Sequence, residues 1–74
     1  MKVSELRLGH VYAGADGSLR FLRERRFDRS HLTMQHDVDT VVYQKVMIRL
    51  LEQEQHQVTA RAFARWAVQE VTTA

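Results

Sequence analysis

The segment Gly14-Ala15-Asp16-Gly17-Ser18 separates two runs that contain apolar residues, 6–13 and 18–27. Its Asp-Gly pair favours a β-hairpin, because both residues tolerate the positive φ angles that tight hairpin turns require. We therefore expect a first strand over residues 6–13, with Gly9 at a bulge or tight bend, and a second strand from Ser18 to about Phe27. The second run does not alternate cleanly, so a helix is the competing interpretation for it.

Residues 40–48 follow a polar connection, 28–39, and are rich in β-branched side chains, which is typical of a buried strand. Extended to residue 56, the same stretch also fits an amphipathic helix with Asp39 or Thr40 as its N-cap. The apolar side of that helix would consist of Tyr43, Val46, Met47, Leu50 and Leu51. We favour the strand and keep the helix as the alternative.

Residues 60–71 predict an amphipathic helix with Thr59 as its N-cap. Its apolar stripe would comprise Ala60, Phe63, Trp66, Ala67 and Val71. No Pro or Gly interrupts the segment, and its alanines favour a helix. We expect Phe63 and Trp66 to pack on the sheet and to form the structural core together with Tyr12.

These elements predict a small α+β fold, with an antiparallel sheet or SH3-like barrel and a C-terminal helix. The alternative is a β-hairpin followed by two antiparallel helices. A chain of 74 residues is expected to form one domain, residues 1–74, with too little material for a deep cleft between two lobes.

The composition argues against several classes of protein. The chain has no Cys, which excludes disulfides and thiolate metal sites. It has no apolar stretch near the roughly 20 residues of a membrane span and no signal-peptide pattern, so we expect a cytoplasmic protein that does not contact membranes. Its serines fit no nucleophile motif, and it has no Gly-rich phosphate loop, so we expect no enzyme activity, catalytic residue or cofactor.

The order of features resembles small uncharacterised proteins of bacteriophages and other mobile elements. The features are Leu-x-x-Gly-x-Val-Tyr (6–12), a Gly-bearing turn, an Arg-rich strand, Val-Val-Tyr (41–43) and Phe-Ala-Arg-Trp-Ala (63–67). The resemblance covers most of the chain and implies a short curved sheet or barrel followed by a terminal helix. It implies no functional residue. Residues 49–57 depart from it, because they are longer and more helix-prone than a simple turn between strands.

Five arginines gather in the expected second strand: Arg20, Arg23, Arg25, Arg26 and Arg29. Guanidinium groups bind phosphate in bidentate fashion and stack on bases, and two phenylalanines stand among these arginines. Arg61 and Arg65 would extend the patch if the helix lay beside the strand. The pattern makes this strand the candidate contact surface of a binding module for nucleic acid or an acidic protein, although a solvated strand face with core phenylalanines is the simpler interpretation of it.

His31 and His36, with Asp37 and Asp39, form the one histidine cluster in the sequence that could attract a metal ion. The two histidines are not spaced for one helical face, and no further good ligand accompanies them. We therefore expect no metal site.

Apolar residues exceed what a short sheet and one helix can bury. The surplus includes Val3, Leu6, Val38, Val41, Leu51, Val68 and the methionines. Surplus apolar surface is usually covered by another copy or another protein. The alternative function is therefore a protein-interaction, inhibitor or assembly module of a phage or mobile element, homodimeric or bound to a host protein, without nucleic-acid binding.

Overall fold

The computed structural model describes residues 1–29, 37–48 and 50–71 of the chain. A 3-10 turn, η1 (Val3–Glu5), precedes three antiparallel strands, β1 (Val11–Gly14), β2 (Leu19–Arg29) and β3 (Asp37–Met47). Two short strands follow, β4 (Leu50–Leu51) and β5 (His56–Thr59), and then helix α1 (Ala60–Trp66) and strand β6 (Ala67–Val71). The prediction of an antiparallel sheet with one helix near the C-terminus is confirmed.

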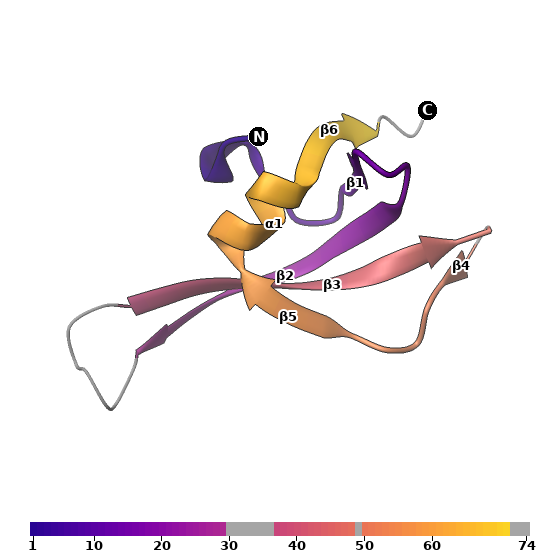
Figure 1. Ribbon diagram of the computed structural model, residues 1–74. Coiled ribbons are helices and arrows are strands. Elements are labelled where there is room, and N and C mark those ends of the chain that lie inside the picture. Colours follow the sequence, from indigo (N-terminus) through magenta and orange to yellow (C-terminus); the bar gives the residue numbers. More distant parts are fainter. Residues whose placement is uncertain (30–36, 49, 72–74) are drawn as a thin grey trace.

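The strands form one sheet in the order β4-β3-β2-β1-β6, and β5 pairs with β3. Because β2 occupies one edge of β3, both β4 and β5 lie along its other edge. Helix α1 crosses one face of the sheet and carries the chain from β5 to β6, which pairs with β1 at the opposite edge (Figure 1). The sheet is not closed in the described part of the chain, so the finer expectation of a barrel is not shown.

The core lies between α1 and the sheet. Tyr12 and Phe63 are fully buried, and their rings meet edge-on with centroids 5.8 Å apart. The ring of Tyr43, on β3, lies with its centroid 5.6 Å from that of Phe63. Leu22 and Val41 belong to the same core cluster. The prediction of Tyr12 and Phe63 as core residues is confirmed, whereas Trp66 is only partly buried at the margin of this cluster.

The turn at residues 14–18 forms the predicted hairpin. Gly17 has a φ of 84°, and its N–H donates to the Gly14 carbonyl at 3.0 Å. The carboxylate of Asp16 accepts hydrogen bonds from the backbone N–H and the hydroxyl of Ser18, at 3.1 and 2.6 Å. Asp-Gly chemistry therefore sets the register of β1 against β2.

The first strand is shorter than predicted. It begins at Val11 rather than at residue 6, because the chain bends at Gly9, which has a φ of 81° and donates its N–H to the Leu22 carbonyl at 2.8 Å. Leu6 precedes this bend and is buried in the core cluster. Gly9 therefore makes a tight bend before the strand, where an L side chain would be strained.

Residues 40–47 belong to β3, so the strand interpretation is confirmed and the two-helix alternative is wrong. The predicted helix over 60–71 is also too long. It begins after the Thr59 cap, whose hydroxyl accepts from the N–H of Ala62 at 3.1 Å, but it ends at Trp66. Residues 67–71 instead supply β6, because pairing with the free edge of β1 satisfies their backbone groups.

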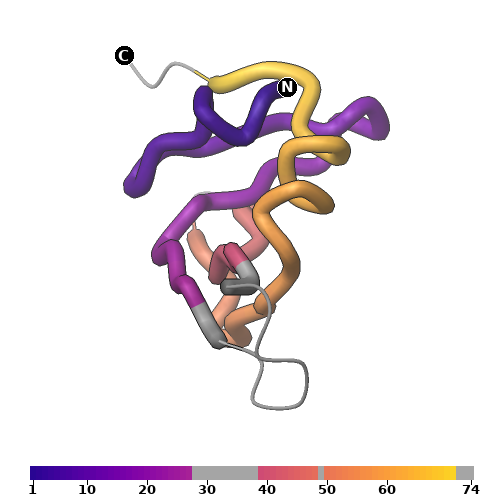
Figure 2. The backbone as a smooth tube through the Cα atoms, turned by 90° about the vertical axis from the view of Figure 1, so that its left-hand side faces the viewer, coloured from indigo at the N-terminus to yellow at the C-terminus, as the bar shows by residue number. Residues whose placement is uncertain are grey.

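The N-terminal segment lies beside β6 and the end of α1 (Figure 2). The Met1 ammonium donates to the carbonyls of Ala64 and Ala67 at 3.2 and 3.4 Å, which are groups that the end of the helix leaves open. No helix in the described ranges has the length and apolar character needed to cross a membrane.

Candidate functional site

The arginines of β2 lie on both faces of the sheet rather than on one. Arg25 is paired with the core residue Val41, so it lies on the face that carries α1. Arg20 shares that face, whereas Arg26 lies on the opposite one. Regular alternation would place Arg20 with Arg26, but a bulge between Leu22 and Glu24 shifts the alternation, so Arg25 rather than Arg26 shares the face of Arg20.

Of the β2 arginines whose side chains are described, Arg25 and Arg26 form ion pairs within the chain. Arg25 binds Asp39 through two hydrogen bonds of 2.9 and 2.5 Å. This contact raises the pKa of Arg25 and holds the pKa of Asp39 below its ordinary value. Arg26 contacts the carboxylate of Glu24 at 2.8 Å. The positive charges of Arg25 and Arg26 are therefore largely offset by carboxylates of the same chain, which weakens their attraction for a phosphate group.

Arg20 is held between aromatic rings. Its guanidinium carbon lies 4.4 Å from the centroid of the Tyr43 ring and 4.0 Å from that of the Trp66 ring, and its buried Nε has no hydrogen-bond partner. Arg23 donates to the side-chain oxygen of Gln44 at 3.1 Å. The side chain of Arg29 lies outside the described residues. Arg20 and Arg23 therefore contact side chains of the sheet and the helix, and they do not form a free basic strip.

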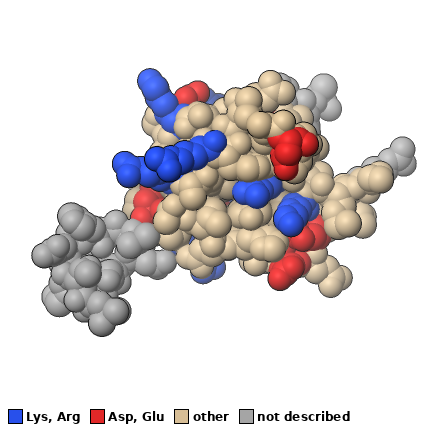
Figure 3. All heavy atoms as spheres, in the orientation of Figure 1, with Lys and Arg blue, Asp and Glu red and all other residues tan. Residues whose placement is uncertain are grey.

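Arg61 and Arg65 are exposed on α1, one turn apart. Basic side chains gather at the upper left of Figure 3, in the area where Figure 1 places α1. In the described part of the chain neither arginine forms an ion pair. The structure therefore does not bring the predicted arginines with described side chains to one surface, because Arg26 lies on the face of the sheet opposite to the one that carries α1.

The interpretation of the β2 phenylalanines as core residues is not confirmed, because Phe21 is only half-buried and outside the core cluster, and it is wrong for Phe27. This side chain is 66% exposed and lies beside Arg25, whose guanidinium carbon is 5.5 Å from the ring centroid. Phe27 is paired with Asp39, so it lies on the core-side face of the sheet without being buried.

Among the described residues, exposed large apolar side chains are concentrated where β3 turns into β4. Met47, Ile48, Leu50 and Leu51 are 58, 93, 67 and 39% exposed, and we call these four residues the hairpin tip. The hairpin projects away from α1 at one end of the sheet (Figure 1). Soluble domains rarely leave such side chains together in water unless they mark a contact surface.

The predicted apolar surplus is therefore only partly real. Leu6 and Val41 are buried, whereas Leu51 and Val68 are exposed. Val38 has no described side chain. The exposed surplus is concentrated at the hairpin tip, and Val68 lies apart from it on the opposite edge strand.

A groove runs beside the hairpin tip, between the β1–β2 turn and the end of β3. Its lining comprises Asp16, Gly17, Ser18, Leu19, Arg20, Lys45, Val46, Met47 and Glu52. The cross-strand pair Arg20 and Lys45 supplies two positive charges, and two carboxylates face them. The mixed charge gives the groove no preference for one sign of ligand.

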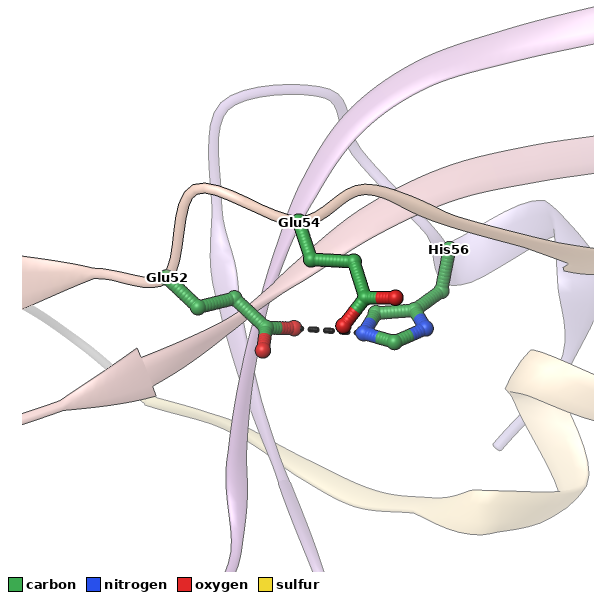
Figure 4. Close-up of side chains that lie close together, drawn as sticks. All are labelled: Glu52, Glu54 and His56. Atoms are coloured by element: carbon green, nitrogen blue, oxygen red, sulfur yellow. Dashed lines mark hydrogen bonds and ion pairs between the residues drawn. The ribbon is translucent and has the colours of Figure 1, made fainter.

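Three potential metal ligands converge directly after β4. One donor atom from each of Glu52, Glu54 and His56 lies within 4.8 Å of the other two, and Figure 4 shows these side chains pointing toward one another. Nε2 of His56 lies 2.6 Å from Oε1 of Glu52. This oxygen also accepts the backbone N–H of Lys45 at 3.0 Å, which is the main reason that the pKa of Glu52 lies below its ordinary value.

The sequence analysis identified neither the hairpin tip nor the cluster of Glu52, Glu54 and His56, and the reason is the same for both. The helical alternative placed Met47, Leu50 and Leu51 on the apolar side of a helix, and Glu52 and His56 on its polar side. The signal that could have found the ligand cluster is the alternation Glu-x-Glu-x-His over 52–56, since an extended chain places every second side chain on one face. The predicted His31–His36 cluster lies outside the described residues.

No protein-family model matches the chain, and neither a curated protein nor a solved structure matches it significantly. The resemblance to phage and mobile-element proteins therefore stays a prediction, and the candidate function rests on the geometry described above.

Proposed function

We propose that the protein is a non-enzymatic protein-interaction module, whose hairpin tip inserts into a concave apolar pocket of a different protein. The observation that carries this proposal is the exposure of four large apolar side chains at a projecting turn, with Ile48 93% exposed at its apex. Large side chains of this kind become the central anchors of an interface when a pocket removes them from water.

The energy available at the hairpin tip is considerable. Full burial of a large aliphatic side chain contributes about 1.5–3 kcal/mol, so the exposed fractions of the four residues correspond to about 4–8 kcal/mol. Association costs about 4–15 kcal/mol in lost translation and rotation. The hairpin tip therefore needs a preformed pocket that adds its own apolar surface.

The shape of the hairpin tip favours a different protein over a second copy of this chain. A standard interface uses about 20–30 residues from each partner, and two convex tips of four residues each fall far short of that number. A concave pocket can enclose the same four side chains on several sides. The surface around the pocket then supplies the remaining contacts.

A site-specific photocrosslinker tests the proposal in cells that express the protein. p-Benzoylphenylalanine replaces Ile48 in one variant and Val68 in a matched control, because Val68 is an exposed apolar residue on the opposite edge strand. We expect position 48, but not position 68, to crosslink to a different protein. That protein is then purified, and its affinity for the wild type, Ile48→Asp and Val68→Asp is measured by fluorescence anisotropy.

Ile48→Asp should weaken this affinity by at least about 30-fold, the effect of one interface anchor. It should leave the thermal stability unchanged, because Ile48 makes almost no packing contacts. Val68→Asp should bind like the wild type. Crosslinks from position 48 only to a second copy of this chain, or equal affinity of wild type and Ile48→Asp, would overturn the proposal.

A second candidate function is nucleic-acid binding, which the exposed pair Arg61 and Arg65 favours. Binding of labelled DNA and RNA oligomers should then weaken steeply between about 50 and 200 mM salt. Reversal of both charges to Glu should abolish it, whereas Arg26→Glu, which alters an arginine already paired with Glu24, should not. Absence of binding at the lower salt concentration would rule this function out.

A further inference from the structure

We propose that Glu52, Glu54 and His56 bind one divalent transition-metal ion of the Zn²⁺ type, with water completing the coordination. The three side chains offer two carboxylate oxygens and one imidazole nitrogen, and one donor atom of each lies within 4.8 Å of the other two. Zn²⁺ accepts this donor set, and three protein ligands with one water are a common arrangement around it.

Two of the three donors are held in place by contacts from outside the cluster. The Glu52 carboxylate accepts the Lys45 N–H at 3.0 Å, and the Glu52 carbonyl accepts from the side chain of Gln44 at 2.7 Å. The His56 ring stacks on Tyr43, with centroids 5.1 Å apart and an angle of 23° between the planes. The β3–β5 pairing therefore positions the imidazole, and the hydrogen bonds from Lys45 and Gln44 position the first carboxylate, before an ion binds.

Glu54 is the adjustable third ligand. Its side chain is exposed, and its carboxylate lies beside the imidazole in Figure 4. Tetrahedral coordination with metal–ligand bonds of about 2.0–2.2 Å requires donors separated by about 3.4 Å. His56 and Glu52 are closer than this, at 2.6 Å, and no pair of donor atoms in the cluster is more than 4.8 Å apart. Small side-chain rotations would bring the three donor atoms to this separation of about 3.4 Å.

The charges at this place also favour a cation. Two carboxylates converge on one imidazole, and in the described ranges neither carboxylate forms an ion pair with Lys or Arg. A divalent ion would relieve the repulsion between them. The imidazole selects against Ca²⁺ and Mg²⁺, which prefer oxygen ligands throughout.

Titration of the ¹⁵N-labelled protein with Zn²⁺, followed by two-dimensional NMR, tests the site residue by residue. We expect saturable binding of one ion, with the largest shifts over residues 52–56 and at Tyr43. Mg²⁺ at the same concentrations should cause no such shifts. Glu54→Gln is the decisive variant, because it removes one ligand from an exposed position without altering the packing. It should weaken Zn²⁺ binding by about 10-fold or more, since even the loss of an outer-shell partner of a ligand typically costs about 10–100-fold in affinity.

His10→Ala is the matched control. His10 also contacts a carboxylate, that of Glu70 at 2.7 Å, but no third ligand accompanies this pair among the described residues. The His10→Ala protein should bind Zn²⁺ like the wild type. Shifts centred on other histidines, unchanged affinity in Glu54→Gln, or no saturation at about 1 mM Zn²⁺ would each overturn the proposal.

Discussion

Replacement of Gly14 by alanine should destabilise the protein strongly, because the Trp66 ring lies against this glycine. A Cβ at position 14 would lie 2.4 Å from Nε1 of Trp66 and 2.5 Å from its Cε2. The φ angle of Gly14 is not in the left-handed region, so the backbone itself accepts alanine. Without the indole, Gly→Ala at such a position would stabilise by about 0.4–1 kcal/mol through the unfolded state.

The magnitude follows from what Trp66 must give up when it moves. Overpacking typically costs about 1–3 kcal/mol. Displacement of the indole also weakens its contact with the Arg20 guanidinium at 4.0 Å and with the Phe63 ring at 5.3 Å, and each such contact contributes about 0.5–1.5 kcal/mol. After the favourable effect on the unfolded state is subtracted, we expect a loss of about 2–4 kcal/mol.

Urea denaturation followed by far-UV circular dichroism measures this loss, and a double-mutant cycle identifies its cause. In a Trp66→Ala background the added methyl group has free space, so Gly14→Ala should become neutral or slightly stabilising. The Trp66 emission of the single variant should also shift to the red as the ring moves toward water. A cost below about 0.5 kcal/mol, or an undiminished cost in the Trp66→Ala background, would refute the reasoning.

Three further predictions concern interactions that hold the sheet and the helix. The pKa of Asp39 lies below its ordinary value of 3.8 because of Arg25, so the pair stabilises fully above pH 3.8 and loses this contribution as the pH falls through the lower folded-state value. Unfolding free energies measured at about pH 5 and 2.5 should therefore differ less in Asp39→Asn than in the wild type. Tyr12→Phe should lower the unfolding free energy by about 1–2 kcal/mol in urea titrations, because the buried hydroxyl no longer accepts the Arg7 N–H at 2.7 Å; an unchanged midpoint would contradict this role. Thr59→Ala removes the cap of α1 and should cost about 1 kcal/mol by thermal denaturation, whereas Thr59→Ser should keep the stability.

Local chemistry explains which parts of the fold could be predicted. The Asp16-Gly17 turn, the strand at 40–47 and the Thr59 cap depend on neighbouring residues in the sequence, and all three are present in the structure. The length of the helix could not be predicted in this way. Residues 67–71 have helical propensity, but the free edge of β1 offers them backbone partners that the sequence does not reveal.

The composition of the candidate binding surfaces depended on the pairing register of the strands, which the sequence does not reveal. The arginines of β2 suggested one basic strip, but the alternation of the strand divides them between two faces, and the bulge decides which arginine lies on which face. Asp39 on β3, Glu24 on the same strand and the Trp66 ring of α1 then engage three of their guanidinium groups. Similarly, residues 47–56 became a projecting tip and a ligand cluster only because β3 and β5 pair and leave the segment between them outside the core.

The sequence by itself therefore determined the turn, the core aromatic residues Tyr12 and Phe63, and the start of the helix, because these follow from interactions between near neighbours or from burial of large rings. Only the tertiary structure decided where the helix ends, which face each arginine occupies and which apolar residues remain in water. These outcomes depend on strand pairing between distant segments, and a single bulge is enough to change the face on which every later side chain lies.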